Sequence, residues 1–313
     1  MGNLSRQEAV LMGAVLVTGA TGFIGSRLIR RLSVAHDVIA LSRGEAAEIG
    51  SYVRGSFTSH SALQALNGYR IDSVVHLASE IGGCSEEAGL SVNVLGTRTL
   101  LRYLFDRGCR HFVLASSIAA VGCLSERFLP RELPIGDDHV CDAIDPYGLS
   151  KALMEELAFY FCRQSPDLEI AIFRIGSVLS EDFARVDDTS QTDETLLDAT
   201  PLPFCAGGAV ASQDVVEALA LAVDCHLGAG ARRMNLVAPT ARTLLPTLEA
   251  LNYSLGQRAS MLDTAYYRAD GHETASLYAI DRLSDAYGFR PSIDVRTMST
   301  TLAVSSRTER EDR

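Results

Sequence analysis

A glycine-rich segment, residues 18–25 with the sequence TGATGFIG, constrains the fold more than any other part of this chain. It follows a short apolar run at residues 14–17 and opens a stretch whose apolar residues recur at helical spacing. In a strand-to-helix turn of this kind, Gly19 permits the tight turn, Gly22 lets the backbone approach a pyrophosphate, and Gly25 allows close helix packing. We therefore predict a dinucleotide site with phosphates at the helix N-terminus. The alternative is a similar turn that holds no ligand.

Short apolar runs alternate with helical patterns through the first 180 residues. Further runs lie at residues 38–41, 52–53, 74–78, 112–115 and 170–173, and helical patterns lie at about 86–107 and 147–163. Strands separated by helices indicate βαβ units and a parallel sheet covered on both faces. The predicted fold class is α/β, a doubly wound parallel sheet (Rossmann fold) with a smaller, interleaved C-terminal substrate-binding part.

The pattern changes after residue 180, where residues 181–200 are polar and acidic. Helical and strand patterns return at 214–227 and 234–237. We predict a dinucleotide-binding domain over residues 1–178, to which residues 209–240 return. Residues 179–208 and 241–304 then form the substrate-binding part, and residues 305–313 a disordered tail.

Composition excludes several classes of protein. Lys plus Arg number 28 against 39 Asp plus Glu, a net charge of −11 that argues against a nucleic-acid partner. No apolar run approaches the roughly 20 residues of a membrane span, and no secretory signal is visible. The seven cysteines form no C-x-x-C pair, and the histidines show no ligand spacing. We expect a cytoplasmic protein with reduced thiols, no metal and no membrane contact.

The chain has one lysine, Lys151, and it follows Tyr147 by four residues, which places both on one helix face. A free tyrosine has a pKa near 10, and a nearby ammonium would lower that pKa by stabilising the phenolate. We predict that Tyr147 is an acid/base and Lys151 its partner, since a compact ammonium also suits ribose hydroxyls. The alternative is a surface Tyr–Lys pair. Ser116 or Ser117, at the end of a predicted strand, would polarise a carbonyl, or the serine pair would simply cap the strand.

The second strand ends at Ser42 and Arg43, without the carboxylate that would bind both ribose hydroxyls of NAD. Ser42 can donate a hydrogen bond to a 2′-phosphate and Arg43 can pair with it. We therefore predict NADP as cofactor, with NAD possible. The alternative is that Arg43 stacks on the adenine or lies in solvent.

Five ordered motifs resemble the extended branch of the short-chain dehydrogenase/reductase superfamily, the NAD(P)-dependent epimerase/dehydratases. They are residues 18–25, VVHLA at 74–78, NVLGT at 93–97, Ser117, and YGLSK at 147–151. The resemblance implies a catalytic triad of Ser117, Tyr147 and Lys151. The residues expected at the cofactor are Gly19, Thr21, Gly22, Phe23, Ile24, Gly25, Ser42, Arg43, Ser56, Leu77, Ala78, Ser79, Asn93, Tyr147, Lys151 and Ile175. Those expected at the substrate are Glu80, Cys84, Ser117 and Ser177.

The sequence also departs from this family's patterns. Residues 118–119 are Ile-Ala where the dehydratases of nucleotide sugars carry Asp-Glu, and no arginine precedes Asp214 to hold a diphosphate. We therefore expect an NADPH-dependent oxidoreductase that reduces a ketone on a small-molecule or sugar-like substrate. The alternative is a nucleotide-sugar epimerase, 4-ketoreductase or atypical dehydratase with tightly held NAD(P). A dinucleotide-sensing regulator is a third possibility, although such proteins tend to lose the Tyr or the Lys.

The helical pattern over residues 147–163 is apolar on a second side, at Leu149, Leu153, Leu157 and Tyr160. A helix with two apolar sides is buried on both. Members of the resembled family commonly pair through this helix, so we expect a homodimer. The alternative is that the C-terminal part of the same chain covers the second side.

Overall fold

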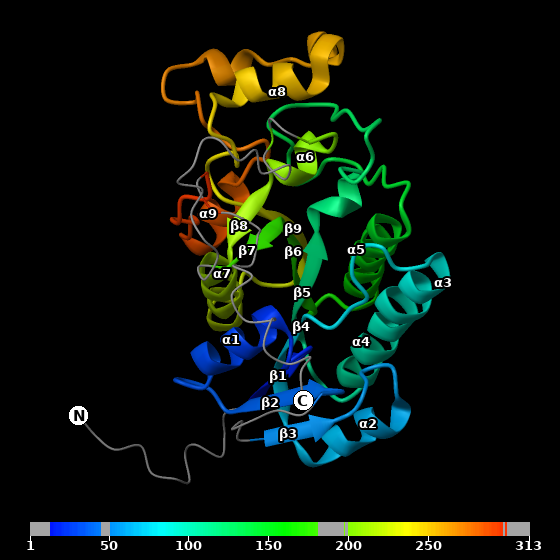
Figure 1. Ribbon diagram of the computed structural model, residues 1–313. Helices are drawn as coiled ribbons and strands as arrows, with labels where there is room; N and C mark the ends of the chain where they lie inside the picture. Colours follow the sequence, from blue (N-terminus) through cyan, green and yellow to red (C-terminus); the bar gives the residue numbers. More distant parts are fainter. Residues whose placement is uncertain (1–12, 45–50, 181–196, 198–199, 297, 299–313) are drawn as a thin grey trace, which may run out of the picture.

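A seven-stranded, wholly parallel sheet forms the centre of the computed structural model, which describes residues 13–44, 51–180, 197, 200–296 and 298 (Figure 1). Its order is β3-β2-β1-β4-β5-β6-β9. The strands are β1 (Ala14–Thr18), β2 (Val38–Ser42), β3 (Ser51–Arg54), β4 (Ile71–His76), β5 (His111–Ser117), β6 (Glu169–Ile175) and β9 (Gly230–Leu236). The order reverses between β1 and β4, and ligands of open α/β sheets bind at the carboxyl ends of the strands there.

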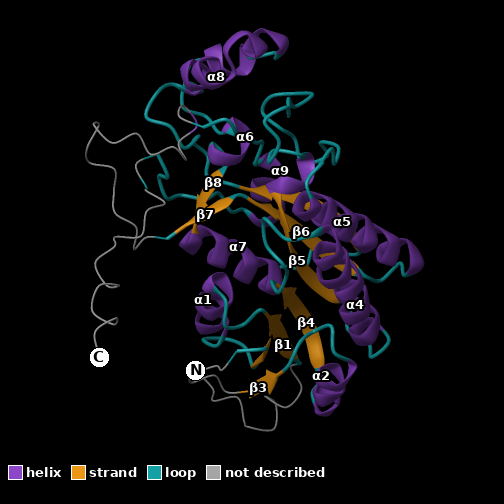
Figure 2. Cartoon of the chain, turned by 45° about the vertical axis from the view of Figure 1, so that its right-hand side comes forward, coloured by secondary structure: helices purple, strands orange, loops and turns teal. Residues whose placement is uncertain are grey.

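Helices cover both faces of this sheet (Figure 2). On one face lie α1 (Phe23–Leu32), α7 (Ser212–Asp224) and α9 (Asp281–Tyr287); on the other lie α2 (His60–Gln64), α4 (Thr97–Phe105) and α5 (Pro146–Gln164). Successive strand side chains alternate between the two cores: Val15 and Val17 pack in one, Leu16 in the other. The predicted doubly wound Rossmann fold is therefore confirmed.

A smaller set of elements forms a third apolar cluster beyond the large sheet. It includes α6 (Pro203–Ala206) and α8 (Thr247–Leu255), near the top of Figure 1. A separate parallel pair, β7 (Ser177–Leu179) and β8 (Ala209–Ala211), lies beside α7. After β8 the chain returns through α7 to add β9 to the large sheet. The domain boundaries stay a prediction, and the proposed tail at 305–313 and most of the acidic segment lie outside the described residues.

The helix expected over residues 86–107 is divided into three parts. A short α3 (Glu86–Ala88) leads into a π-helical segment, Gly89–Gly96, before α4 begins. The wider π turn places Asn93 in the protein interior. A Cβ at Gly96 would lie 2.7 Å from Cγ2 of Thr58, so only glycine allows this approach. Within the described residues, no helix is long and apolar enough to cross a membrane.

Candidate active site

The glycine-rich turn has the geometry that a phosphate-binding turn needs. Gly19 has a φ of +70°, and a Cβ there would lie 2.8 Å from the backbone nitrogen of Ala78. A Cβ at Gly25 would lie 2.2 Å from the carbonyl oxygen of Gly19, so α1 packs directly on the turn. The first turn of α1 holds no acidic residue. Its free N–H groups and positive dipole end are therefore open to a phosphate.

This turn lines a cavity of about 640 Å³ at the carboxyl ends of the strands. That volume is within the usual range for a cofactor or ligand site. Of the residues expected at the cofactor, the cavity is lined by Gly19, Thr21, Gly22, Phe23, Ile24, Gly25, Ser42, Arg43, Ser56, Leu77, Ala78, Ser79 and Ile175. Lining residues that the sequence did not reveal include Phe57, Thr58, Ile81, Val92 and Ala115. Most of these residues follow strand ends and belong to no recognisable sequence motif.

The end of β2 supplies hydroxyl and guanidinium groups to the cavity. Ser42 Oγ lies 2.6 Å from Thr21 Oγ1, so the two hydroxyls form one hydrogen-bonding surface beside the glycine turn. Arg43 lines the same cavity and makes no hydrogen bond or ion pair within the described part of the chain. Tyr52 donates a hydrogen bond to the Ser42 carbonyl oxygen at 3.0 Å, which fixes this strand end. No carboxylate of the described residues lines this end.

The two adjacent serines at the end of β5 face opposite ways because strand side chains alternate. Ser116 is buried and donates to Glu155 Oε1 at 2.6 Å. Ser117 Oγ accepts a hydrogen bond from the Ala119 backbone nitrogen at 3.1 Å and lies close enough to the Tyr147 hydroxyl to lower its pKa. Ser117 is therefore the serine beside Tyr147, whereas Ser116 is bound to Glu155.

The start of α5 places Tyr147 and Lys151 beside Ser117. Asp145 caps this helix by accepting a hydrogen bond from the Gly148 nitrogen at 2.7 Å. Lys151 Nζ donates to the carbonyl oxygen of Ala115, a cavity-lining residue, at 2.8 Å and lies 5.6 Å from the Tyr147 ring centroid. Burial lowers the pKa of Lys151 to about 8, so the ammonium stays mostly charged at neutral pH.

The pKa of Tyr147 is shifted in the direction opposite to that expected from the sequence. Burial raises it, and the hydrogen bond from Ser117 only partly offsets this. Lys151 is not among its main influences, because the ammonium is directed to the Ala115 carbonyl. The free protein therefore holds Tyr147 as a neutral phenol, ready to donate a proton.

Asn93 is a positioning residue rather than a lining residue of the cavity. Its Oδ1 accepts from the Glu80 backbone nitrogen at 2.7 Å, and its Nδ2 donates to the Glu80 carbonyl and to Ser150 Oγ. Ser150 in turn donates to the Tyr147 carbonyl oxygen at 2.7 Å. The amide of Asn93 thus connects the loop after β4 to the first turn of α5.

The four residues expected at the substrate have different positions. Glu80 lines the cavity. Cys84 is close enough to Tyr147 and Lys151 to raise the pKa of each. Ser177 lies on β7, where it donates to the Cys205 carbonyl oxygen at 3.3 Å, and it does not line the cavity.

A buried histidine, His76, joins the glycine turn to β4 and α4. No pattern in the sequence predicted this role. His76 bonds Thr18 Oγ1 at 2.7 Å and Thr97 Oγ1 at 2.9 Å. Burial lowers the pKa of His76 to about 3, so this imidazole is neutral. Thr18 also accepts from the Ala78 nitrogen at 3.2 Å, which holds the strand ends together under the cavity.

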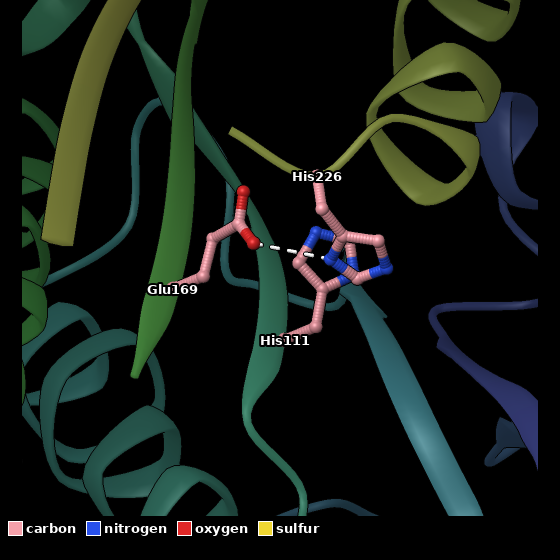
Figure 3. A group of neighbouring side chains, drawn as sticks. All are labelled: His111, Glu169 and His226. Carbon is pink, nitrogen blue, oxygen red and sulfur yellow. Dashed lines mark hydrogen bonds and ion pairs between the residues drawn. The ribbon is translucent and has the colours of Figure 1, made fainter. Parts of the chain in front are cut away.

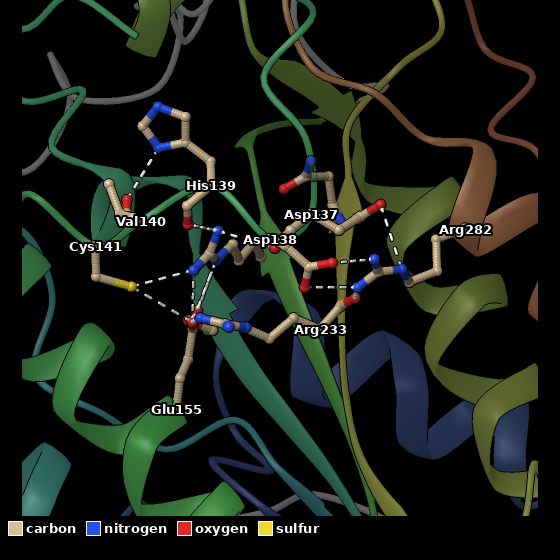
Figure 4. A network of polar contacts seen from close by, with 11 residues as sticks. Asp137, Asp138, His139, Val140, Cys141, Glu155, Arg233 and Arg282 are labelled. Carbon is tan, nitrogen blue, oxygen red and sulfur yellow. Dashed lines mark hydrogen bonds and ion pairs between the residues drawn. The ribbon is translucent and has the colours of Figure 1, made fainter. Parts of the chain in front are cut away.

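Behind Ser116, a buried ion-pair network anchors the catalytic helix (Figure 4). Glu155 of α5 and Arg174 of β6 are fully buried and pair at 2.8 Å. Arg174 Nη1 also donates to the carbonyl oxygens of Asp137 and His139. The network connects α5, β6 and the segment that precedes α5.

The fold and these side chains together define a class of protein. A parallel sheet with a glycine turn, a dinucleotide-sized cavity and a Ser–Tyr–Lys group at its end is a short-chain dehydrogenase/reductase. A family model described as the NAD dependent epimerase/dehydratase family matches residues 15–199. The chain belongs to this family and is a nicotinamide-dinucleotide-dependent enzyme.

Curated relatives are similar to the chain over different lengths. A putative UDP-glucose 4-epimerase of Methanocaldococcus jannaschii is 25% identical over 300 residues, covering 90% of this chain and 94% of that protein. A UDP-glucose 4-epimerase of Lactobacillus helveticus is 30% identical over 155 residues, 46% of this chain and 45% of that protein. With the exception of the first, the chain spans about half the length of the curated relatives it matches.

Solved structures of the same fold cover nearly the whole chain. A short-chain dehydrogenase/reductase superfamily protein of Agrobacterium tumefaciens with bound NAD has a TM-score of 0.66 at 23% identity, covering 90% of this chain and 94% of that one. A UDP-glucose 4-epimerase of Thermotoga maritima with UDP-glucose has a TM-score of 0.61 at 19% identity, covering 90% and 95%. These likenesses establish the fold.

Proposed function

We propose that this chain is an epimerase-type enzyme that oxidises and re-reduces a secondary alcohol carbon of a nucleotide-sugar substrate. The observation that carries the proposal is the group of Ser117, Tyr147 and Lys151, which is linked to the lining of the dinucleotide-sized cavity by the hydrogen bond from Lys151 to the Ala115 carbonyl. One relative that is similar along almost its whole length is described as a putative UDP-glucose 4-epimerase. This similarity favours the epimerase alternative over the ketone reductase expected first from the sequence.

The cavity fits a nicotinamide dinucleotide. Gly19 and Gly25 leave no room for side chains, and the N-terminus of α1 faces the space that a pyrophosphate would take. Leu77, Ala78 and Ser79 line the cavity after β4 and would pass beneath the cofactor. When bound, the nicotinamide supplies a hydride acceptor and donor.

The chain's own residues then manage the proton and the substrate oxygen. Once deprotonated, Tyr147 takes the proton of the reacting hydroxyl in one direction, and the phenol so formed returns it in the other, which is general base and then general acid catalysis. Ser117 donates a hydrogen bond from its hydroxyl to the reacting oxygen, whose charge changes during the reaction. Lys151, whose ammonium lies near the tyrosine ring, would stabilise the transient phenolate and hold the ribose hydroxyls of the bound dinucleotide.

The preferred dinucleotide is NADP in this proposal. Ser42 and Arg43 line the adenosine end, and no carboxylate of the described residues is present there to repel a 2′-phosphate. Arg43 makes no other polar contact within the described ranges, so its guanidinium remains available for a charge-assisted bond.

Net ketone reduction is the second candidate, and a specific observation favours it. The segment before Asp214 is the buried apolar strand Ala209–Ala211, without the arginine expected of a diphosphate site. Two buried arginines of the described chain are engaged elsewhere: Arg174 pairs with Glu155, and Arg242 donates to the Met298 carbonyl oxygen.

One experiment separates the two candidates. Purified protein is incubated with UDP-glucose or UDP-galactose, the sugars are followed by proton NMR, and dinucleotide absorbance is recorded. Interconversion without net absorbance change supports the epimerase. No interconversion, together with stoichiometric NADPH oxidation by ketone substrates, would instead establish the reductase.

A further inference from the structure

Three side chains with metal-ligating atoms meet at the amino-terminal edge of the large sheet (Figure 3). His111 is the first residue of β5 and Glu169 the first of β6, and the two are paired in register. His226 follows the end of α7. One nitrogen from each histidine and a carboxylate oxygen of Glu169 all lie within 4.8 Å of one another.

His111 presents an unpartnered nitrogen to this group. Its side chain is buried, with the residue 3% exposed, and its Nδ1 lies 2.9 Å from Ser73 Oγ. Its Nε2 is buried and has no hydrogen-bond partner. A buried nitrogen without a partner is costly, and this one requires an explanation. In the tautomer that carries its proton on Nδ1, this N–H donates to Ser73 and Nε2 has a free lone pair, which is the arrangement of a metal-bound histidine fixed by a second partner.

The other two side chains complete the set of donors. Glu169 Oε1 accepts a hydrogen bond from the Leu227 nitrogen at 2.5 Å, and Oε2 lies 3.1 Å from His226 Nδ1. The His226 side chain is 60% exposed, and its ring lies over that of His111 with centroids 4.3 Å apart (Figure 3).

We propose that His111, Glu169 and His226 bind one zinc ion, with water as the fourth ligand. Two imidazole nitrogens and one carboxylate oxygen are donors that zinc takes in tetrahedral geometry. At zinc–ligand distances of about 2.1 Å, ligand atoms stand roughly 3.4 Å apart. The three ligand atoms lie within 4.8 Å of one another, which is wider than this spacing. Rotation of the exposed His226 ring would bring its nitrogen to the zinc-binding distance. The buried His111 and Glu169 supply the fixed half of the site.

The position of this site indicates a structural role. His111 is six residues before Ser117 on β5, which corresponds to about 20 Å along the strand. The ion would join β5, β6 and the connection between α7 and β9 at the edge opposite the cofactor cavity. The sequence predicted no metal because these ligands are far apart along the chain, without a short spacing motif.

The test is metal titration of the full chain after chelator treatment. Isothermal titration calorimetry with Zn²⁺ gives stoichiometry and affinity, and Co²⁺ substitution reports the donor atoms through its visible spectrum. We expect one ion per chain, with tetrahedral Co²⁺ bands and no thiolate charge-transfer band. His226→Ala and Glu169→Gln should each weaken Zn²⁺ binding by at least about 10-fold. The Glu169→Gln variant keeps an oxygen for the Leu227 nitrogen, so the fold is retained.

Two control variants separate this site from other donors of the chain. His60→Ala removes an exposed histidine of α2, and Cys225→Ser removes the exposed thiol next to His226. Both should bind Zn²⁺ as the wild type does. The proposal is overturned if the wild type binds no stoichiometric Zn²⁺, if the His226 and Glu169 variants bind like the His60 control, or if Cys225→Ser abolishes binding. In the first case, the group is only an ion pair between His226 and Glu169.

Discussion

At the residue scale, we expect the proton of Tyr147 to carry the chemistry. Tyr147→Phe removes the hydroxyl beside Ser117 and should lower kcat by about 10²–10⁴-fold, the usual contribution of a general acid. Dinucleotide affinity, measured by fluorescence titration, should remain near the wild-type value because the glycine turn is untouched. Near-normal turnover in this variant would mean that another group transfers the proton.

We expect Arg43 to decide the choice of dinucleotide. Arg43→Ala should raise the KM for NADPH by about 10-fold, or about 1.4 kcal/mol, while the KM for NADH changes little. The physical reason is that only NADPH carries the 2′-phosphate to which a guanidinium pairs. Steady-state kinetics with both cofactors at equal concentration provide the measurement. Equal loss with both cofactors would show that Arg43 contacts the adenine instead.

Because Lys151 is buried, the free energy of unfolding should depend on pH in the alkaline range. Its pKa is about 8 in the folded chain against 10.5 for the free side chain, so between these values the unfolded state binds the extra proton. Stability from this group therefore rises with pH across that window and is lost as pH falls through about 8. Relative to Lys151→Met, the wild-type unfolding free energy should gain up to about 3 kcal/mol from pH 7.5 to 10.5.

Urea denaturation of both proteins at each pH measures this difference, and the comparison cancels the titration of groups that the two proteins share. A constant difference between the proteins across the window would show that folding does not lower the pKa of Lys151.

Single residues also show where sequence reasoning stops. The positions of Ser117, Tyr147 and Lys151 follow from a strand end and a helical spacing, which are local. The raised pKa of Tyr147 comes from burial and from neighbours such as Asp145 and Cys84, which only the folded chain brings together.

At the scale of elements, the homodimer through α5 stays a prediction. Leu153 and Tyr160 are exposed on this helix although its other side is buried, so no described part of the chain covers them. Leu153→Arg should convert a dimer into a monomer of 33.7 kDa, because a guanidinium would be buried at the contact. Light scattering at micromolar concentration measures the mass.

Leu244→Arg is the matched control, since Leu244 is equally apolar and exposed but lies outside α5. It should leave the mass unchanged. A wild-type mass of one chain would contradict the dimer.

The main strands and α5 were predictable from the sequence, whereas very short or irregular elements were not. β1 and β2 are continuous apolar runs, and α5 follows a helical spacing of apolar residues. The π-helical segment Gly89–Gly96 lies inside a continuous helical pattern and differs from it only through contacts with distant residues. β7 and β8 have three residues each, too few for a period to show.

At the scale of the whole molecule, the Glu155–Arg174 pair holds the catalytic helix to the sheet. Glu155 accepts from Ser116 of β5, Arg174 of β6 and Arg233 of β9, so one carboxylate connects three strands to α5. Glu155→Gln leaves a fully buried guanidinium without its counter-charge and should cost about 3–5 kcal/mol of unfolding free energy.

The matched control is Glu156→Gln, which changes the neighbouring, exposed carboxylate of the same helix. It should alter stability by no more than about 0.5 kcal/mol in urea denaturation. The double variant Glu155→Met with Arg174→Met removes both charges. It should lose less stability than the sum of its single variants, because each single variant leaves the other buried ion without its partner and the double variant does not. Strict additivity in that cycle, or equal stability of the Glu155→Gln and Glu156→Gln variants, would show that the pair does not hold α5 to the sheet.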